Sequence, residues 1–382
     1  MKLRQRIERE IREHGPMPFS RFMELCLYDP ELGYYSRHAE QFGKAGDFYT
    51  SSDVHAVFGR LLARQFEEMW RVLGSPKEIE LLELGPGRGL FARDVLDWSE
   101  KKWPDFFQAL HYSVEERSPE LRARLQQTLS KHLSTGRAQV TVPEPVTHSA
   151  IPRISRSLPA QIPTIVFANE FFDALPVEIV GQKGELHLDI REDHLVEVWF
   201  SITPEAQAFL DRFSVQPEPQ ERLEVPLLAP SYMKRIAAEV TRGFVTIIDY
   251  GYTRDEQLAG HHRGTLSTFR LHSEGSNPYE APGEQDITAH VNFTALAAAA
   301  TQAGMQVQKL RTQSQWLMGI GESNQFADAF EECRLPQEQA KVALQLKHLV
   351  TPAGMGESFH VLLASRGVNP DAVSTLAGLR FG

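Results

Sequence analysis

The order of apolar and polar positions predicts a chain in which strands alternate with helices. Seven short runs of mostly apolar residues suit buried strands, and helical spacing fills several of the gaps between them. The runs are residues 79–84, 111–116, 139–142, 164–168, 244–249, 306–310 and 359–365. Helices placed between buried strands are typical of a parallel sheet that is covered on both faces. The pattern therefore predicts an α/β fold.

Helical periodicity also marks the beginning of the chain. Leu3, Ile7 and Ile11 recur at helical spacing within a charged stretch, which predicts an amphipathic first helix. Residues 19–27 predict a second helix, and residues 54–73 predict a long helix before the first core strand. The first helix lacks an apolar signal core and is rich in glutamate, so we expect neither a secretory signal nor a mitochondrial presequence. On this basis the sequence predicts a cytoplasmic location.

Two stretches interrupt the alternation of strands and helices. Residues 177–242 contain a hairpin-like segment at 180–200 and a proline-rich piece after it. Residues 253–286 are predicted to form loops because they carry several glycines and little periodicity. We interpret both stretches as insertions into the α/β fold.

A glycine turn joins the first predicted core strand to a helix, in the sequence Glu83-Leu84-Gly85-Pro86-Gly87-Arg88-Gly89. Glycine has no Cβ, so such a turn lets the backbone and the helix start approach a bound ligand closely. The spacing differs from the GxGxxG of dinucleotide sites, whose third glycine would fall on Leu90. It fits the ExGxGxG pattern that is common in methyltransferases that use S-adenosylmethionine. The turn therefore predicts a site for that cofactor rather than for NAD.

Acids and amides follow the ends of several predicted strands. Glu116 ends the second strand, where a carboxylate can bind the hydroxyls of a ribose, and Glu115 is the competing candidate. Asn169 with Glu170 and then Asp249 end two later strands. In open α/β sheets ligands bind at this edge, so these side chains are candidates for contacts with cofactor and substrate. The alternative for Asn169 is a helix cap.

Composition and charge argue against a nucleic-acid-binding, disulfide-rich or membrane-inserted protein. The 382 residues carry a net charge of −10, which opposes binding to nucleic acid and favours a basic peptide or protein partner. The two cysteines, Cys26 and Cys333, are far apart and predict neither a disulfide framework nor a metal site. No stretch approaches the roughly 20 apolar residues that span a bilayer, so we expect no membrane insertion.

Several strings of residues, spread over nearly the whole chain, resemble the MidA-type family of S-adenosylmethionine-dependent methyltransferases. Besides the glycine turn they are Leu27-Tyr28-Asp29-Pro30, Gly33-Tyr34-Tyr35, Gly46-Asp47-Phe48, Asn169-Glu170-Phe171-Phe172-Asp173-Ala174-Leu175-Pro176, Asp249-Tyr250-Gly251-Tyr252, Gly264-Thr265-Leu266 and Asp286-Ile287-Thr288-Ala289-His290-Val291. The resemblance implies a Rossmann-like class I methyltransferase fold, with a seven-stranded, mostly parallel sheet and a second, smaller lobe. Mitochondrial members of the family are complex I assembly factors that methylate arginine. Departures from the family pattern include Asn292 in place of aspartate and His360 in place of lysine.

The resemblance also implies a division of the chain. Residues 1–75 would form N-terminal helices and a loop that covers the cofactor. Residues 76–176, 244–252 and 305–365 would form the methyltransferase core. Residues 177–243 and 253–304 would be inserted segments on the substrate side.

Site residues follow from the resemblance together with the chemistry of the side chains. The expected cofactor-binding residues are Asp47, Thr50, Ser51, Glu83, Gly85, Gly87, Gly89, Glu116 and Asn169. An arginine acceptor is permanently charged and a poor nucleophile, so carboxylates that hold its other nitrogens would favour methyl transfer. The expected acceptor residues are Glu170, Asp173 and Asp249, and Asp286 and His290 are further candidates for an ion pair or a base. A structural hydrogen-bonding role is the alternative for His290.

Other functions stay open from sequence alone. The acceptor could be a small molecule, or the chain could bind S-adenosylmethionine as an assembly factor with little catalysis. A nicotinamide-dependent oxidoreductase is disfavoured by the glycine spacing. The expected partner is a protein substrate, by resemblance a respiratory complex subunit, and the sequence leaves the homodimer question open.

Overall fold

A computed structural model describes residues 2–37, 56–143, 159, 161–192, 194–270, 273–275 and 277–381. The chain divides into two compact units. The first unit comprises Met1–Phe48, Phe171–Tyr232 and Gly251–Ala299, and the second comprises Tyr49–Glu170, Met233–Tyr250 and Ala300–Gly382. Each unit is built around its own cluster of buried apolar side chains. No helix in the described part of the chain combines the length and apolar character that a membrane crossing requires.

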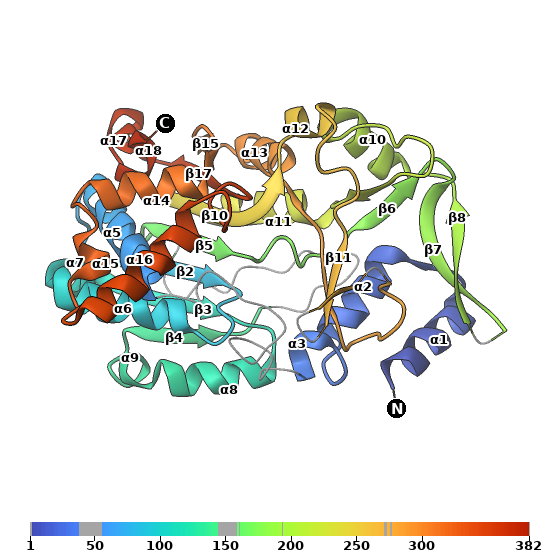
Figure 1. Cartoon of the computed structure of the whole chain (residues 1–382), viewed down its shortest axis with the longest axis horizontal. Coiled ribbons are helices and arrows are strands. Elements are labelled where there is room, and N and C mark those ends of the chain that lie inside the picture. Colours follow the sequence, from blue (N-terminus) through green and yellow to red (C-terminus); the bar gives the residue numbers. More distant parts are fainter. Residues whose placement is uncertain are drawn as a thin grey trace. The chain divides into compact units, whose positions relative to one another are not determined.

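A mostly parallel sheet forms the centre of the second unit, with its strands in the order β15-β17-β10-β5-β2-β3-β4 (Figure 1). β2, β3, β4, β5 and β10 run parallel to their neighbours, whereas β17 is antiparallel to β10. The short β16 also pairs with β17. The strands are β2 (Ile79–Leu84), β3 (Leu110–Glu115), β4 (Ala138–Thr141), β5 (Thr164–Asn169), β10 (Gly243–Tyr252), β15 (Gln306–Val307), β16 (Arg311–Thr312) and β17 (Phe359–Arg366).

Aromatic side chains fix the helices of the second unit to this sheet. Phe91 of α6 stacks on Phe167 of β5 with ring centroids 4.6 Å apart, and Phe66 of α5 meets Phe167 edge-on at 5.5 Å. Gly59 allows α5 and α6 to lie close together, because a Cβ there would be 2.8 Å from the Cβ of Asp94. The helices are α5 (Ala56–Val72), α6 (Leu90–Lys102), α7 (Pro104–Ala109), α8 (Pro119–Thr128), α9 (Ser130–Ser134), α14 (Gln313–Glu322), α15 (Ala327–Phe330), α16 (Pro336–Val350), α17 (Pro370–Ser374) and α18 (Ala377–Arg380). α11 (Leu228–Glu239) begins in the first unit and ends in the second.

The first unit holds two smaller sheets. One contains β1 (Met17–Pro18), β7 (Gly184–Arg191), β6 (Glu178–Gly181) and β9 (Arg222–Val225), and β8 (His194–Phe200) pairs with β7. The other contains β12 (Ser273–Gly275), β11 (Ser267–Arg270) and β13 (Asp286–Thr288). β14 (Val291–Asn292) pairs with the last two residues of β10. The helices are α1 (Leu3–His14), α2 (Phe19–Tyr28), α3 (Tyr34–Arg37), α10 (Pro204–Phe213), α12 (Arg254–Leu258) and α13 (Phe293–Gln302), whose last residues belong to the second unit.

The periodicity predicted the strands of the sheet in the second unit and the first long helices. Each of the seven expected strand regions contains a strand, and α1, α2 and the described part of the 54–73 helix are confirmed. Two expectations need correction. The region 306–310 holds only the short β15, and the 253–286 stretch, expected to be loop, contains α12 and the strands β11 and β12. Gly260, Gly264 and Gly283 lie between these elements and Gly275 ends β12, and the pairing of β11 with β12 and β13 stabilises strands whose sequence has weak alternation.

Replacing Phe167 with alanine should lower the free energy of unfolding of the second unit by about 3–5 kcal/mol, because the ring is fully buried between two other rings. Urea unfolding followed by tryptophan fluorescence would measure this, since four of the five tryptophans lie in the second unit. Leu344→Ala is the control: this side chain is 69% exposed, so we expect a change within about 0.5 kcal/mol. Equal effects of the two substitutions would contradict the packing argument.

Candidate functional site

The glycine turn between β2 and α6 adopts a backbone that only glycine accepts easily. Gly85, Gly87 and Gly89 have φ values of 65°, 54° and 76°, all in the left-handed region. The Gly85 N–H donates to the carbonyl of Glu115 at 3.1 Å, which ties the start of the turn to β3. A Cβ at Gly87 would meet no described atom within 4 Å, whereas one at Gly89 would collide with Leu125. The turn therefore presents open backbone at Gly87 and packed backbone at Gly89.

Glu83 is a buried acid at the carboxyl end of β2. The Tyr112 hydroxyl on the neighbouring β3 donates to Glu83 Oε2 at 2.8 Å. Burial raises the pKa of Glu83 to about 8, although the hydrogen bond from Tyr112 opposes that rise. A cationic ligand would stabilise the ionised form of this carboxylate, because a nearby positive charge offsets the free-energy cost of burying a negative one.

Glu116 follows β3 and is also buried. Its Oε1 accepts the backbone N–H of Ser118 at 2.7 Å, which fixes the carboxylate at the start of α8. Burial raises the pKa of Glu116 to about 7, against the effect of that N–H. Glu115, the competing candidate for a ribose contact, is buried as well and pairs with Leu84 and Thr141 in the sheet.

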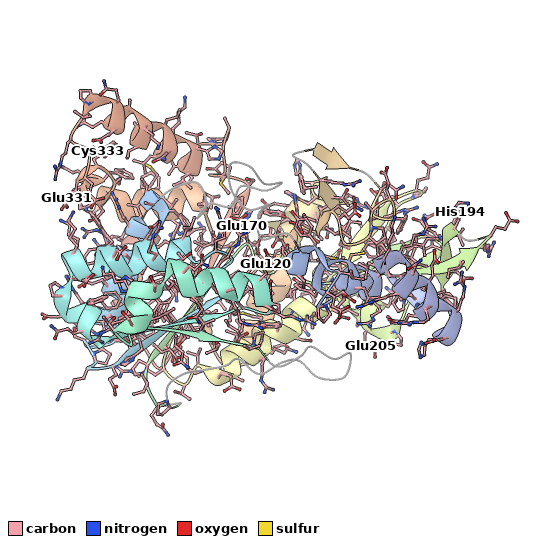
Figure 2. The ribbon with its side chains drawn as sticks, turned by 90° about the horizontal axis from the view of Figure 1, so that it is seen from below. Glu120, Glu170, His194, Glu205, Glu331 and Cys333 are labelled. Carbon is pink, nitrogen blue, oxygen red and sulfur yellow. The ribbon has the colours of Figure 1, made fainter. Side chains whose placement is uncertain are left out.

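Asn169 and Glu170 lie where β5 ends. The Asn169 side-chain amide donates to Glu170 Oε1 at 3.1 Å, and the Glu170 N–H donates to Ile248 of β10 at 3.0 Å. Glu170 has a left-handed φ of 49°, which is uncommon for a residue with a side chain and costs about 1–3 kcal/mol. Such strain is often found at functional sites. Figure 2 labels Glu170.

Asp249 is fully buried near the carboxyl end of β10. Its Oδ1 accepts the N–H of Tyr250 at 3.0 Å, and in the antiparallel ladder it lies directly opposite His360 of β17. The register of β3, β2, β5 and β10 thus brings Glu83, Glu116, Asn169, Glu170 and Asp249 to one edge of the sheet of the second unit.

Asp173 and Asp286 belong to the first unit, and both are buried. The Tyr35 hydroxyl donates to Asp286 Oδ1 at 2.9 Å, and the Asp173 carbonyl accepts the N–H of Ala289 at 3.0 Å. Burial raises the pKa of Tyr35 well above its usual value, and the nearby Asp286 raises it further. The phenol therefore stays a hydrogen-bond donor to this carboxylate.

His290 is paired with a second histidine. Its Nδ1 lies 3.1 Å from Nδ1 of His262, and its backbone N–H donates to the Thr265 hydroxyl. A hydrogen bond between two imidazole nitrogens requires at least one neutral ring. Burial lowers the pKa of His262, which favours a neutral ring there.

Asn292, where the family pattern has aspartate, makes two structural hydrogen bonds in the first unit. Its Oδ1 accepts the N–H of Ala295 at the start of α13, and its Nδ2 donates to the carbonyl of Phe213 at 2.8 Å. Aspartate could make only the first of these. Three expected cofactor residues, Asp47, Thr50 and Ser51, lie outside the described residues.

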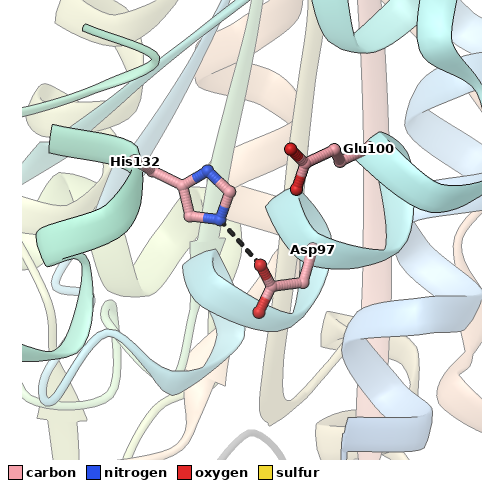
Figure 3. Close-up of side chains that lie close together, drawn as sticks. All are labelled: Asp97, Glu100 and His132. Atoms are coloured by element: carbon pink, nitrogen blue, oxygen red, sulfur yellow. Dashed lines mark hydrogen bonds and ion pairs between the residues drawn. The ribbon is translucent and has the colours of Figure 1, made fainter. Parts of the chain in front are cut away.

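One group of possible metal ligands occurs among the described residues, and it lies on the helices of the second unit (Figure 3). His132 Nε2 is 2.9 Å from Asp97 Oδ1, and Glu100 lies beside them. The Lys131 ammonium is 2.8 Å from Asp97 and also contacts Glu100. Because a lysine already supplies the positive charge, this cluster is interpreted as an ion-pair network.

A family model for S-adenosyl-L-methionine-dependent methyltransferases matches residues 61–311, which is more than half of the chain. The chain belongs to the MidA-type methyltransferase family. It is 30% identical to the mitochondrial protein arginine methyltransferase NDUFAF7 homolog of Drosophila melanogaster, over 96% of this chain and 85% of that protein. It is 26% identical to human mitochondrial protein arginine methyltransferase NDUFAF7, over 92% of this chain and 80% of that protein.

A solved structure agrees with this assignment. A COG1565 superfamily member from Burkholderia thailandensis, solved with bound S-adenosyl-homocysteine, has 26% sequence identity and a TM-score of 0.80, covering 100% of this chain and 95% of that one. The predicted Rossmann-like α/β fold and the S-adenosylmethionine cofactor of this MidA-type methyltransferase are therefore confirmed.

The prediction of a cytoplasmic location is wrong, because the curated relatives are mitochondrial proteins. The prediction rested on the acid-rich first helix. That stretch is α1, whose Leu3, Ile7 and Ile11 are buried in the core of the first unit. A helix that belongs to the folded domain carries no information about the compartment.

Some partners of the site residues in this MidA-type methyltransferase could not be found from sequence. Tyr112 reaches Glu83 only through the register of β2 and β3, and His262 reaches His290 across 28 positions of the chain. Tyr35 belongs to the family string Gly33-Tyr34-Tyr35, but that string does not indicate Asp286 as its partner.

Gly87→Ala should weaken binding of S-adenosylhomocysteine at least tenfold, or by about 1.4 kcal/mol. The new Cβ would occupy the open side of the turn, where we expect the cofactor backbone contact. Gly136→Ala is a matched control, because Gly136 also has a positive φ (70°) and open space around its Cβ position, but lies outside the turn. Calorimetric titration measures both variants. Equal affinities for the two would contradict the placement of the cofactor at Gly87.

Binding of S-adenosylhomocysteine should release roughly one proton at pH 7, since the ligand ammonium favours ionised Glu83 and the ribose hydroxyls, as donors, favour ionised Glu116. The raised pKa values also mean that the cofactor-free protein loses stability as pH rises from about 4.5 to 8, because over that range both acids ionise in the unfolded chain while they keep their protons longer in the folded protein. Titrations in phosphate and Tris buffers give the proton count from the difference in apparent enthalpy.

Glu83→Gln should reduce that proton release, while Glu120→Gln on the surface of α8 should leave it unchanged. If the apparent enthalpy is the same in both buffers, the coupling of proton release to binding is absent.

Proposed function

We propose that this MidA-type methyltransferase transfers a methyl group from S-adenosylmethionine to an arginine side chain of a protein. The observation that carries the proposal is the similarity, over 96% of the chain, to a relative named as a protein arginine methyltransferase. The net charge of −10 supports it, because an acidic protein attracts a basic substrate peptide.

The cofactor-binding residues would be Glu83, the glycine turn, Glu116 and Asn169, with Asp47, Thr50 and Ser51 from the N-terminal segment. The open side of Gly87 and the two buried carboxylates fit a ligand that carries an ammonium and a ribose. When bound, S-adenosylmethionine supplies the methyl group. The chain contributes orientation and charge.

Carboxylates are the groups that an arginine acceptor needs. Its guanidinium stays protonated at physiological pH, so a methyl acceptor nitrogen gains reactivity when the charge is held on the other nitrogens. Glu170 follows β5, and Asp249 lies in the neighbouring β10. The Glu170 N–H donates to the carbonyl of Ile248, the residue before Asp249. The strained backbone of Glu170 supports its assignment as the leading acceptor residue.

Asp173, Asp286 and His290 are proposed as further acceptor residues from the first unit. Tyr35 would keep Asp286 oriented, and His262 would keep His290 in a hydrogen-bonded, partly neutral pair. In the same scheme, residues 177–243 and 253–304 select the substrate and residues 1–75 cover the cofactor.

The substrate is proposed to be a subunit of respiratory complex I, which rests on the family resemblance alone. We also propose that the protein acts as a homodimer.

Labelled S-adenosylmethionine incubated with enzyme and peptides tests the proposal. We expect label in arginine peptides and none in peptides in which lysine replaces arginine, and mass spectrometry would locate it on the guanidinium. Label only in small molecules of a lysate would refute the protein substrate. Absence of transfer despite tight S-adenosylhomocysteine binding would indicate an assembly factor.

Glu170→Gln should lower kcat by about 100-fold, equivalent to about 2.7 kcal/mol, with little change in S-adenosylhomocysteine affinity. The reason is that the amide keeps the shape of the side chain and removes the charge that would hold the guanidinium. Glu120→Gln, a surface glutamate also labelled in Figure 2, is the control and should keep full activity. Unchanged kcat in Glu170→Gln would remove Glu170 from the acceptor site.

A further inference from the structure

β8 is an edge strand of the larger sheet in the first unit. It pairs with β7 along its whole length, and no strand in the described part of the chain pairs with its other edge. His194, labelled in Figure 2, is its first residue. An edge of this kind presents backbone N–H and C=O groups that can pair with another chain.

The two faces of this hairpin differ in chemistry. On the inner face, Leu195 and Trp199 of β8 pack against the core of the first unit. On the outer face, β7 presents His187 and Asp189, which are polar. The residues of β8 directly opposite them are Val198 and Val196, which are partly exposed.

Phe200 extends this apolar outer face and is 47% exposed. The outer face of β8 is therefore an apolar stripe, Val196, Val198 and Phe200, next to polar neighbours on β7. Small exposed apolar groups are common, but a stripe along an open strand edge is typical of a place where another strand packs.

Of the devices that usually block edge pairing, the strand has one inward-pointing charge, Glu197, on the same face as Leu195 and Trp199. It contains no lysine and no proline. Its one acid, Glu197, is neutralised: Arg222 donates to both carboxylate oxygens at 2.6 and 2.7 Å, and the Tyr279 hydroxyl donates at 2.9 Å. The only negative charge on β8 is thus already paired within the same unit.

The sequence of β8 is symmetric about Glu197. Valine stands on each side of it, and the large apolar Leu195 and Trp199 stand one position further out. In an interface with two-fold symmetry, residue i of one copy meets residue j of the other and j meets i, so a self-complementary strand is what that symmetry requires.

We propose that β8 pairs antiparallel with β8 of a second copy of this chain, centred on Glu197. Val196 of each copy then lies opposite Val198 of the other, and Leu195 lies opposite Trp199. The larger sheets of the two first units become one continuous sheet. Each Glu197 keeps its own Arg222 as counter-ion. This proposal gives a location to the proposed homodimer and does not depend on the methyl acceptor.

The pair of substitutions Val196→Lys and Val198→Lys tests the interface. In the proposed register they bring four ammonium groups together, so the dissociation constant of the dimer should rise at least 100-fold. Size-exclusion chromatography with light scattering measures the mass. Wild type should be a dimer and the lysine variant a monomer. Leu258→Lys changes another exposed apolar residue of the first unit, 60% exposed, and should leave the dimer intact.

Charge reversal and cross-linking make the test specific for the register. The lysine variant mixed with a Val196→Glu, Val198→Glu variant should form heterodimers. In a Cys333→Ser background, Val196→Cys and Val198→Cys should give no cross-link alone and a disulfide-linked dimer when mixed one to one. The cross-link does not depend on a destabilising substitution, so it also covers the case in which the lysine variant fails to fold.

A monomeric wild type would overturn both the homodimer and the β8 interface. A wild-type dimer that the lysine pair leaves intact, with no cross-link in the cysteine mixture, would overturn the β8 interface and leave the homodimer. Methyl transfer to an arginine peptide, measured on the same samples, reports separately on the proposed function.

Discussion

The parallel register of β3, β2, β5 and β10 is the constraint on which the rest of the site depends. Parallel strands end at the same edge, so each strand delivers its terminal residues to one row. The Gly85 N–H bonded to Glu115 marks where β2 stops and the turn begins. The left-handed glycines then redirect the chain into α6 without a side chain on the open side of Gly87. Site geometry is thus a consequence of sheet geometry.

That geometry has a cost in stability. Glu83 and Glu116 are buried acids with raised pKa values, and Glu170 holds a strained backbone conformation. None of these features helps the cofactor-free protein to fold, because burying a charge and forcing a left-handed φ are both unfavourable. Packing elsewhere must offset them, and the stacked Phe91 and Phe167 lie directly behind this edge on α6 and β5.

Sequence predicted the core of the second unit well for a physical reason. Strands such as β2, with the sequence IELLEL, are buried on both faces, so they appear in the sequence as continuous, mostly apolar runs. The three closely spaced glycines after β2 are typical of a ligand-binding turn. The cross-strand partners of the site residues could not be predicted in this way. Tyr112 on Glu83 and His262 on His290 depend on register and on contacts between distant segments, which periodicity does not contain. The strands β11 and β12 were missed because their stability comes from pairing rather than from alternation.

The cofactor and the acceptor place different demands on the chain, and this explains why one was easier to infer than the other. A cofactor shared by a whole family requires backbone approach, which leaves glycines at fixed spacing. An acceptor is chosen by carboxylates, and acids are also used for caps and ion pairs, as Asp97 with Lys131 illustrates. The informative acids are those that combine burial with an unfavourable setting. For Glu83 and Glu116 the unfavourable feature is the burial that raises their pKa values. For Glu170 it is the left-handed backbone conformation. A half-exposed acid such as Glu120, which lies beside Arg124 on the same helix, pays little of this cost, so its position alone does not indicate a function.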